Sequence, residues 1–338
     1  MSAPEDEPFT LPAGLPRAAP GRVRVLSLSG GGYRGLFTAA LIRALEARLG
    51  PDPARPTPFG QRFDLIAGTS IGGILATALS CRATGAALQA LLQRRGSSIF
   101  PPMRLRGLRK LLGRAPYDPQ RLRSAICELL PDAEQQLLGQ HAPALLLTTV
   151  NWTTSKLQLL GSRPTLGQRD QLGLTLMDAM LATSAAPAHF PVHSFQHHRF
   201  VDGGLAANAP DLHALQCAQQ MYPGAEVHML SIGTANPLHG RDPSAVPGRG
   251  LMWAGPVIEL VTSAQEMLAV QECAARMGTH RYLRLNMPPS SAQQKQLDFD
   301  VADQTSTDLL LSLADDCLAS LQPADWHRLK AIVGAVGL

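Results

Sequence analysis

Short apolar runs alternate with stretches in which apolar residues recur every three or four positions. The first apolar run, residues 23–28, ends in a glycine cluster, and apolar residues then recur from Leu36 to Leu45. A second run, residues 63–67, leads into another glycine-rich turn and a second periodic stretch. Short apolar runs bounded by turn residues are typical of buried strands, and the spacing of three to four is typical of helices. The N-terminal part of the chain therefore predicts two strand–turn–helix units.

The same alternation continues toward the C-terminus. One more strand should end at Asp202, and further strands are expected at residues 144–150, 156–160, 227–233 and 281–285. Most of the remaining C-terminal part has a helical pattern, and further helices are expected at residues 176–183 and 211–221. Strands that alternate with helices predict an α/β fold, in which a mainly parallel central sheet is covered by helices on both faces.

Two segments depart from this pattern. Residues 1–21 are rich in Pro, Ala and acidic side chains, which predicts a flexible N-terminal tail before a single domain at residues 22–338. Residues 94–123 hold nine Arg and Lys side chains interleaved with Leu, Met, Phe and Pro. This basic insertion is expected to act either as a lid or ligand clamp, or as a solvated surface hairpin with ordinary arginines.

Composition places the chain among ordinary globular proteins. Of its 338 residues, 45% are hydrophobic and 17% are charged, and the net charge of +4 is too small to favour binding to a nucleic acid polymer. The five cysteines are scattered without a CxxC pair, so neither a disulfide framework nor a zinc site is expected. The N-terminus lacks the charged-then-apolar pattern of a signal peptide, and we expect a cytoplasmic protein.

The first candidate for chemistry is the sequence Gly68-x-Ser70-x-Gly72, between an expected strand and an expected helix. A serine on this sharp turn presents its hydroxyl above the sheet, and the helix N-terminus beside it favours a developing negative charge. The pattern alone is also compatible with a glycine-rich helix start that packs closely on a strand. Its position after an apolar strand favours Ser70 as a nucleophile.

The second candidate is the glycine-rich loop at residues 29–35, with the sequence SGGGYRG. Consecutive glycines leave backbone N–H groups able to approach an anion, as an acyl-transfer enzyme requires for the oxyanion of its intermediate. A phosphate loop is the alternative, but the Lys-Ser/Thr end of a P-loop and the G-x-G-x-x-G spacing are both missing. Arg34 in this loop would either bind a phosphate head group or brace the loop.

The third candidate is Asp202-Gly203-Gly204, followed closely by Asn208 and Pro210. An aspartate at the end of a strand, followed by two small residues, can point its carboxylate into a site and take a proton from a serine. By itself the same sequence often forms a simple turn. The assignment of Asp202 as a base therefore depends on the other two motifs.

Together these motifs resemble the patatin-like phospholipases. SGGGYRG, GTSIGG, the segment ATSAAP at residues 182–187 and VDGGLAANAP occur in the family's order, over roughly residues 22–235. The resemblance implies a three-layer patatin fold and an acyl hydrolase that uses a Ser–Asp dyad without a metal or cofactor. It assigns Ser70 and Asp202 as the dyad and Gly31 and Gly32 as the oxyanion donors. Residues in supporting loops would be Gly30, Arg34, Gly68, Gly72 and Gly203. Plant patatins usually carry Asp at the position of Ser29, whereas the related cytosolic phospholipases have Ser.

Within the family, the chain is similar to bacterial CBASS phospholipases. This resemblance lies in LSLSGGGYRGLFTA, FDLIAGTSIGG, VNWTT, LSIGT and the sequence SAQE at residues 263–266. It implies activation by a cyclic dinucleotide such as cGAMP, anti-phage defence by attack on membrane phospholipid from the inner face, and assembly into a homo-oligomer on activation. Because arginines clamp phosphate oxygens, candidates for nucleotide binding are Arg104, Arg106 and Arg109.

The sequence also leaves three alternatives open. An ordinary α/β-hydrolase would use a Ser–Asp–His triad, for which His280 is the candidate base. A general lipid acyl hydrolase would lack nucleotide control. A catalytically silent nucleotide-sensing module would keep the fold without the activity. Metal-dependent hydrolysis is disfavoured because the histidine pairs have no carboxylate or cysteine at ligand spacing.

Overall fold

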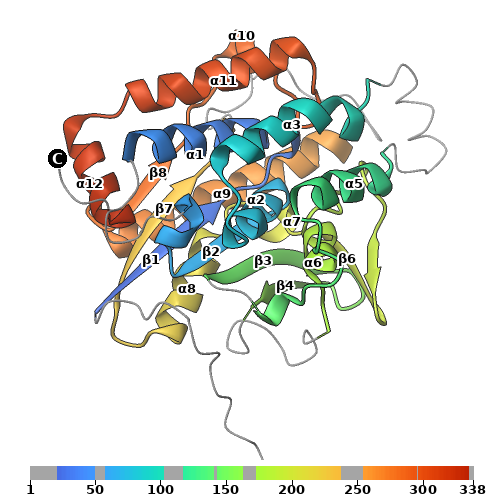
Figure 1. The fold of residues 1–338 in the computed structure, drawn as a ribbon, viewed down its shortest axis with the longest axis horizontal. Coiled ribbons are helices and arrows are strands. Elements are labelled where there is room, and N and C mark those ends of the chain that lie inside the picture. The colour runs from blue at the N-terminus through green and yellow to red at the C-terminus, as the bar shows by residue number, and fades with distance from the viewer. Residues whose placement is uncertain are drawn as a thin grey trace, which may run out of the picture.

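A mixed eight-stranded sheet forms the centre of the part of the chain that the computed structural model describes (Figure 1). The described residues are 21–49, 58–102, 117–140, 143–162, 173–236, 254–294 and 296–334. The strand order is β5-β6-β3-β2-β1-β7-β8, and β4 pairs with β3 outside this path. The strands are β1 Arg22–Leu28, β2 Leu65–Thr69, β3 Ala144–Asn151, β4 Lys156–Gly161, β5 His193–Phe195, β6 His198–Asp202, β7 Glu226–Ile232 and β8 Tyr282–Leu285.

Parallel pairing connects the central strands. The pairs β1–β2, β1–β7, β2–β3 and β7–β8 are all parallel, whereas β4 and β6 run antiparallel to β3. Leu28 at the end of β1 lies opposite both Gly68 and Ile232, so the carboxyl ends of three strands meet at one edge. This edge is where an α/β sheet places its functional loops. The predicted mainly parallel sheet is confirmed.

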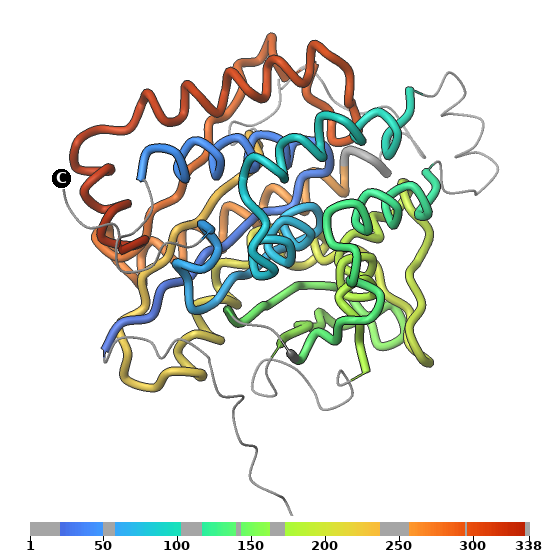
Figure 2. Tube along the Cα trace, viewed as in Figure 1, coloured from blue at the N-terminus to red at the C-terminus, as the bar shows by residue number. Residues whose placement is uncertain are grey.

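Helices cover both faces of the sheet, which confirms the three-layer prediction (Figures 1 and 2). Helices α8 and α9 pack on one face, and helices including α1, α2, α11 and α12 pack on the other. The α-helices are α1 Gly35–Leu49, α2 Ile71–Ser80, α3 Gly85–Ile99, α5 Pro119–Leu129, α6 Leu176–Thr183, α7 Gly204–Ala207, α8 Asp211–Met221, α9 Ala254–Met277, α10 Ser291–Gln294, α11 Gln304–Ala319 and α12 Pro323–Val333. Short 3₁₀ helices occupy Gly32–Arg34, Phe59–Arg62 and Leu138–Gln140.

One hydrophobic core lies on each face of the sheet. Side chains of β1 alternate between them, because successive residues of a strand point to opposite faces. Leu26 and Leu28 belong to the core under α1 and α2, whereas Val23 and Val25 belong to the core under α8. All four side chains are fully buried. Burial on both faces explains why the apolar residues of β1 are not confined to alternate positions of the strand.

The two ends of the predicted basic insertion lie in helices. Arg94 and Arg95 of α3 both form ion pairs with Glu128 of α5, at 2.6 Å each, and these contacts connect the two helices. Residues 103–116, which include Arg104, Arg106 and Arg109, lie outside the described residues, as do residues 1–20 of the predicted tail. The lid and the nucleotide clamp therefore stay predictions.

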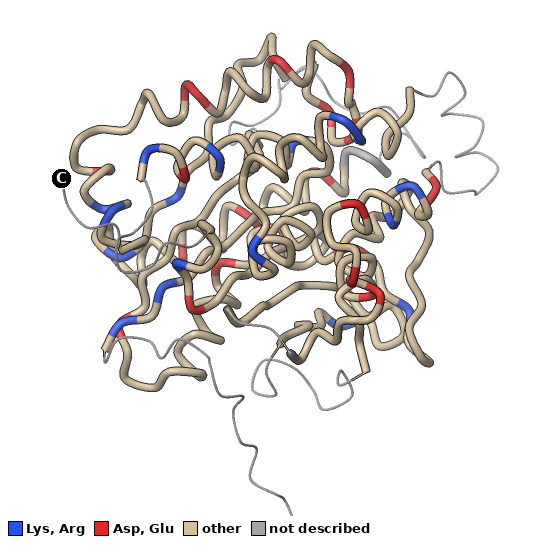
Figure 3. The backbone as a smooth tube through the Cα atoms, in the orientation of Figure 1, with Lys and Arg blue, Asp and Glu red and all other residues tan. Residues whose placement is uncertain are grey.

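Charged side chains of both signs are interspersed along the described chain (Figure 3). In the described part, no helix is both long and apolar enough to span a bilayer. All five cysteines are described and are free thiols.

Candidate active site

Ser70 lies on the sharp turn between β2 and α2. Its backbone adopts φ 55° and ψ −126°, a conformation that is rare for a residue with a side chain. The turn requires glycine on both sides of the serine. A Cβ on Gly72 would lie 2.5 Å from the carbonyl oxygen of Ser29, and a Cβ on Gly68 would overlap the backbone of Gly72. The G-x-S-x-G spacing thus lets the strand, the serine turn and the glycine-rich loop pack against one another.

A buried threonine fixes the Ser70 backbone. The Ser70 N–H donates to Thr183 Oγ1 at 2.9 Å, and the Thr183 hydroxyl donates in turn to the carbonyl oxygen of Thr148 at 2.6 Å. Because the Ser70 N–H already has this partner, it is not free to bind an oxyanion. Donors for an oxyanion must come from a neighbouring loop.

Asp202 ends β6 and lies next to Ser70. The antiparallel pairing of β6 with β3 places Asp202 opposite Thr149, close to the edge where β2 ends. The Gly204 N–H donates to Asp202 Oδ1 at 2.7 Å, and the Ser70 hydroxyl lies near enough to the same carboxylate to lower its pKa by hydrogen bonding. Burial raises the pKa of Asp202 from 3.8 to about 6, although both hydrogen bonds act in the opposite direction. Asp202 is therefore an ionised, weakly solvated base near neutral pH.

The glycine-rich loop after β1 lies at the same edge. The carbonyl oxygen of Gly30 accepts from Thr234 Oγ1 at 2.9 Å, and the carbonyl oxygen of Gly31 accepts from Arg34 Nε at 3.4 Å. The C=O and N–H of one peptide point in opposite directions. The Gly31 N–H therefore points away from Thr234, and the Gly32 N–H points away from the Arg34 side chain. Neither N–H donates a hydrogen bond to any described residue. Both remain available as donors.

Arg34 braces this loop. Besides its bond to Gly31, its guanidinium lies near three acidic side chains, those of Glu266, Asp298 and Glu259. Burial lowers the pKa of Arg34, and the acidic neighbours oppose that effect. Of the two roles considered from sequence, these contacts favour the brace over the head-group ligand.

Helix α9 holds the two loops in place, a role that the sequence did not predict. Gln265 donates to the carbonyl oxygen of Gly204 and accepts from the N–H of Asn208 at 3.3 Å. Glu266 is 1% exposed and accepts from Asn208 Nδ2 at 2.6 Å and from Arg284 Nη2 at 2.5 Å. The sequence SAQE was a point of resemblance without a role. The only signal in the sequence for this role was a glutamine and a glutamate in one turn of a long helical stretch.

A narrow apolar pocket of about 30 Å³ adjoins Ser70. Its walls come from the glycine-rich loop, α2, α3, α5 and the segments before β5 and after α10. Large apolar side chains in these walls are Leu92, Ile99, Phe100, Leu122, Phe190 and Phe299. The lining matches an acyl chain in character, but the pocket must widen to hold one.

His280 lies at the opposite edge of the sheet from Ser70. It precedes β8, which is parallel to the central strands, so it sits at the amino edge of the sheet. Ser70 follows the carboxyl end of β2, at the other edge. This placement removes His280 as the base of a triad. The described residues contain no cluster of three or more side chains suited to holding a metal ion.

Comparison with known families gives one match that covers more than half of the chain. The family model described as patatin-like phospholipase matches residues 26–215. This range includes the glycine-rich loop, Ser70 and Asp202.

Two bacterial relatives match most of the chain. A cGAMP-activated phospholipase from Pseudomonas aeruginosa is 34% identical over 284 residues, covering 81% of this chain and 82% of the relative. A cGAMP-activated phospholipase from Escherichia coli is 32% identical over 333 residues, covering 91% of this chain and 92% of the relative. Among solved structures, human GIVD cytosolic phospholipase A2 aligns with a TM-score of 0.46 at 12% identity, covering 93% of this chain and 60% of that one.

Proposed function

The chain belongs to the patatin-like phospholipase family and is a lipid acyl hydrolase, and we propose that Ser70 and Asp202 form its catalytic dyad. The substrate is the acyl ester of a membrane glycerophospholipid. One observation carries the assignment: the hydroxyl of Ser70, on its strained turn, lies beside the buried carboxylate of Asp202 and lowers its pKa. A serine next to a buried base has the arrangement of an activated nucleophile.

The reaction proceeds in two halves. Ser70 Oγ attacks the carbonyl carbon of the ester while Asp202 takes the hydroxyl proton. The N–H groups of Gly31 and Gly32 donate to the resulting oxyanion. Collapse of this intermediate expels the lysophospholipid alkoxide, which receives the proton from Asp202 and leaves an acyl-serine. Water then attacks the acyl-serine with Asp202 as the base again, which releases the fatty acid and restores Ser70.

The raised pKa of Asp202 suits both halves. At a pKa of about 6 the group is mostly ionised at neutral pH, yet it holds a proton more readily than a solvated carboxylate does. Proton transfer to and from a group tuned toward the working pH is efficient in both directions.

The same proposal includes control by a cyclic dinucleotide. The names of the two bacterial relatives support this step, since both are cGAMP-activated phospholipases. The narrowness of the acyl pocket agrees with a resting form that must open. In this proposal residues 22–338 form a single domain, and the 94–123 insertion is its lid. The enzyme attacks the inner face of the membrane during anti-phage defence. Activation assembles it into a homo-oligomer.

Lipid mass spectrometry tests the proposal. The purified protein is mixed with phosphatidylethanolamine and phosphatidylglycerol vesicles, with and without cGAMP. We expect free fatty acid and lysophospholipid to form slowly alone and much faster with cGAMP. A folded Ser70→Ala variant should form neither product. Hydrolysis by that variant would overturn the dyad, equal rates with and without cGAMP would leave a general lipid acyl hydrolase, and no hydrolysis by any form would leave the silent nucleotide-sensing module.

A further inference from the structure

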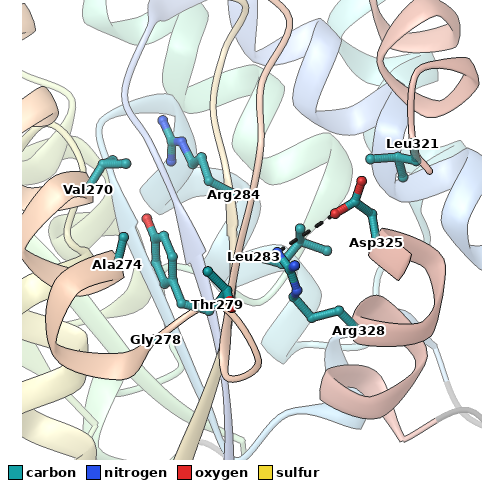
Figure 4. A pocket seen from close by; sticks show the side chains of 10 residues that line it. Val270, Ala274, Gly278, Thr279, Leu283, Arg284, Leu321, Asp325 and Arg328 are labelled. Atoms are coloured by element: carbon teal, nitrogen blue, oxygen red, sulfur yellow. Dashed lines mark ion pairs between the residues drawn. The ribbon is translucent and has the colours of Figure 1, made fainter. Parts of the chain in front are cut away.

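A groove of about 360 Å³ crosses the open edge of the sheet at β8 (Figure 4). Strand β8 forms its floor, Val270 and Ala274 of α9 form one wall, and Leu321, Asp325 and Arg328 form the other at α12. The volume lies within the range of roughly 300 to 1,000 Å³ that is usual for small-molecule sites. The groove is separate from the apolar pocket at Ser70, with which it shares no lining residue.

The floor offers backbone hydrogen-bonding groups. Among the described residues β8 is the last strand of the sheet path. The Arg281 carbonyl oxygen accepts from Met229 of β7, and the Leu285 carbonyl oxygen accepts from Gly233, which follows β7. Since successive residues of a strand direct their backbone groups to opposite sides, those of Tyr282 and Arg284 point out of the edge into the groove. Their N–H groups suit phosphate oxygens, and their carbonyl oxygens suit the amino groups of a base.

The α12 wall offers one charge of each sign. Arg328 Nη1 and Asp325 Oδ1 are 3.7 Å apart, one turn apart on the helix, and each side chain is about a quarter exposed. An ion pair at this distance, with both side chains partly exposed to solvent, contributes little free energy. A nucleotide can separate it, because a guanidinium binds phosphate and a carboxylate accepts from the ring N–H and amino group of guanine. The apolar side chains of Val270, Ala274 and Leu321 supply the surface on which a base lies.

The groove is connected to the catalytic loops through one buried ion pair. Arg284 lines the groove, and its guanidinium donates to Glu266, which is also the acceptor for Asn208. Asn208 Nδ2 reaches the carbonyl oxygen of Gly30 at 3.5 Å, next to the oxyanion donors. Helix α9 thus carries both a groove wall, at Ala274, and the residues that hold the loops.

We propose that this groove binds the cyclic dinucleotide that controls the enzyme, and that binding repositions α9 and, through Arg284 and Glu266, the oxyanion loop. The inference rests on the proposed function, since it places the activator that the function requires. A ligand shifts such an equilibrium only by its different affinity for the two forms, so the groove must change shape between the resting and active enzyme.

Two neighbouring alanines on α9 allow a matched test. Ala274 lines the groove and Ala275 does not, and both are exposed, so we expect tryptophan at either position to leave the fold intact. Calorimetry with cGAMP should show affinity reduced at least about tenfold in Ala274→Trp and unchanged in Ala275→Trp. Arg328→Ala should lose affinity by about tenfold as well, as expected for a charged hydrogen bond. The exposed Arg276→Ala on α9 is its control.

The outcomes separate the site from the function. If the wild type binds cGAMP and is activated, but Ala274→Trp and Arg328→Ala bind equally well, the groove is not the site and the function stands. If charge-neutral replacements of Arg104, Arg106 and Arg109 abolish binding while the groove variants retain it, the site lies in the 94–123 insertion. If the wild type binds no cGAMP, nucleotide control and this site fail together while vesicle hydrolysis still tests the dyad.

Discussion

Replacing Asp202 by asparagine should inactivate the enzyme and stabilise the fold, in a way that depends on pH. Burial raises the Asp202 pKa from 3.8 to about 6. Between pH 4 and 6 the folded protein therefore holds a proton that the unfolded chain has released, so stability falls as pH rises through this window. A pKa rise of this size corresponds to about 3 kcal/mol. Above pH 6 the folded protein carries the whole penalty of a buried, ionised carboxylate.

Asparagine has nearly the same shape and never ionises. Its carbonyl oxygen can still accept from the Gly204 N–H, which donates to Asp202 at 2.7 Å. The free energy of unfolding of Asp202→Asn should exceed that of the wild type by up to about 3 kcal/mol at pH 7, and the two should converge near pH 4. Esterase activity should be lost at every pH. In the wild type, kcat/KM should fall about tenfold for each pH unit below 6.

Urea unfolding from pH 4 to 8, together with turnover of a small soluble ester, measures both effects. Asp315→Asn, a replacement of an exposed aspartate on α11, is the matched control and should change neither quantity. A stability difference between Asp202→Asn and the wild type that is the same at pH 4 and pH 7 would refute the reasoning, because the effect would then not arise from ionisation.

Two further variants test the rest of the site. His280→Ala should change ester turnover by less than about twofold, since His280 is at the opposite edge of the sheet from Ser70; a loss comparable to that of Asp202→Asn would restore the triad. Gly32→Ala should lower kcat at least about a hundredfold, because Gly32 has φ 57° and an added Cβ would overlap the carbonyl oxygen of Phe299. Gly139→Ala, where a Cβ meets no atom within 4 Å, is its control and should retain full turnover.

The sequence by itself predicted the turns that form the candidate site. G-x-S-x-G identified the Ser70 turn because only glycine avoids the close backbone contacts at Gly68 and Gly72. The glycine-rich loop and the Asp202 turn were predicted for the same reason. Where backbone segments pack closely only glycine fits, and consecutive glycines are visible in the sequence. The helix at residues 176–183 and the helix at residues 211–221 also have the bounds that the structure shows.

Only the tertiary structure decided which distant residues support that chemistry. The antiparallel direction of β6, which brings Asp202 to Ser70, is set by pairing with β3 more than forty residues away in sequence. The role of Glu266 depends on Asn208, which follows α7, and on Arg284 of β8. The groove exists because β8 ends the described sheet between α9 and α12. Long-range contacts of this kind leave no periodicity in the sequence, because each residue fits the helix, strand or loop pattern of its own segment. Only tertiary packing brings the partners together.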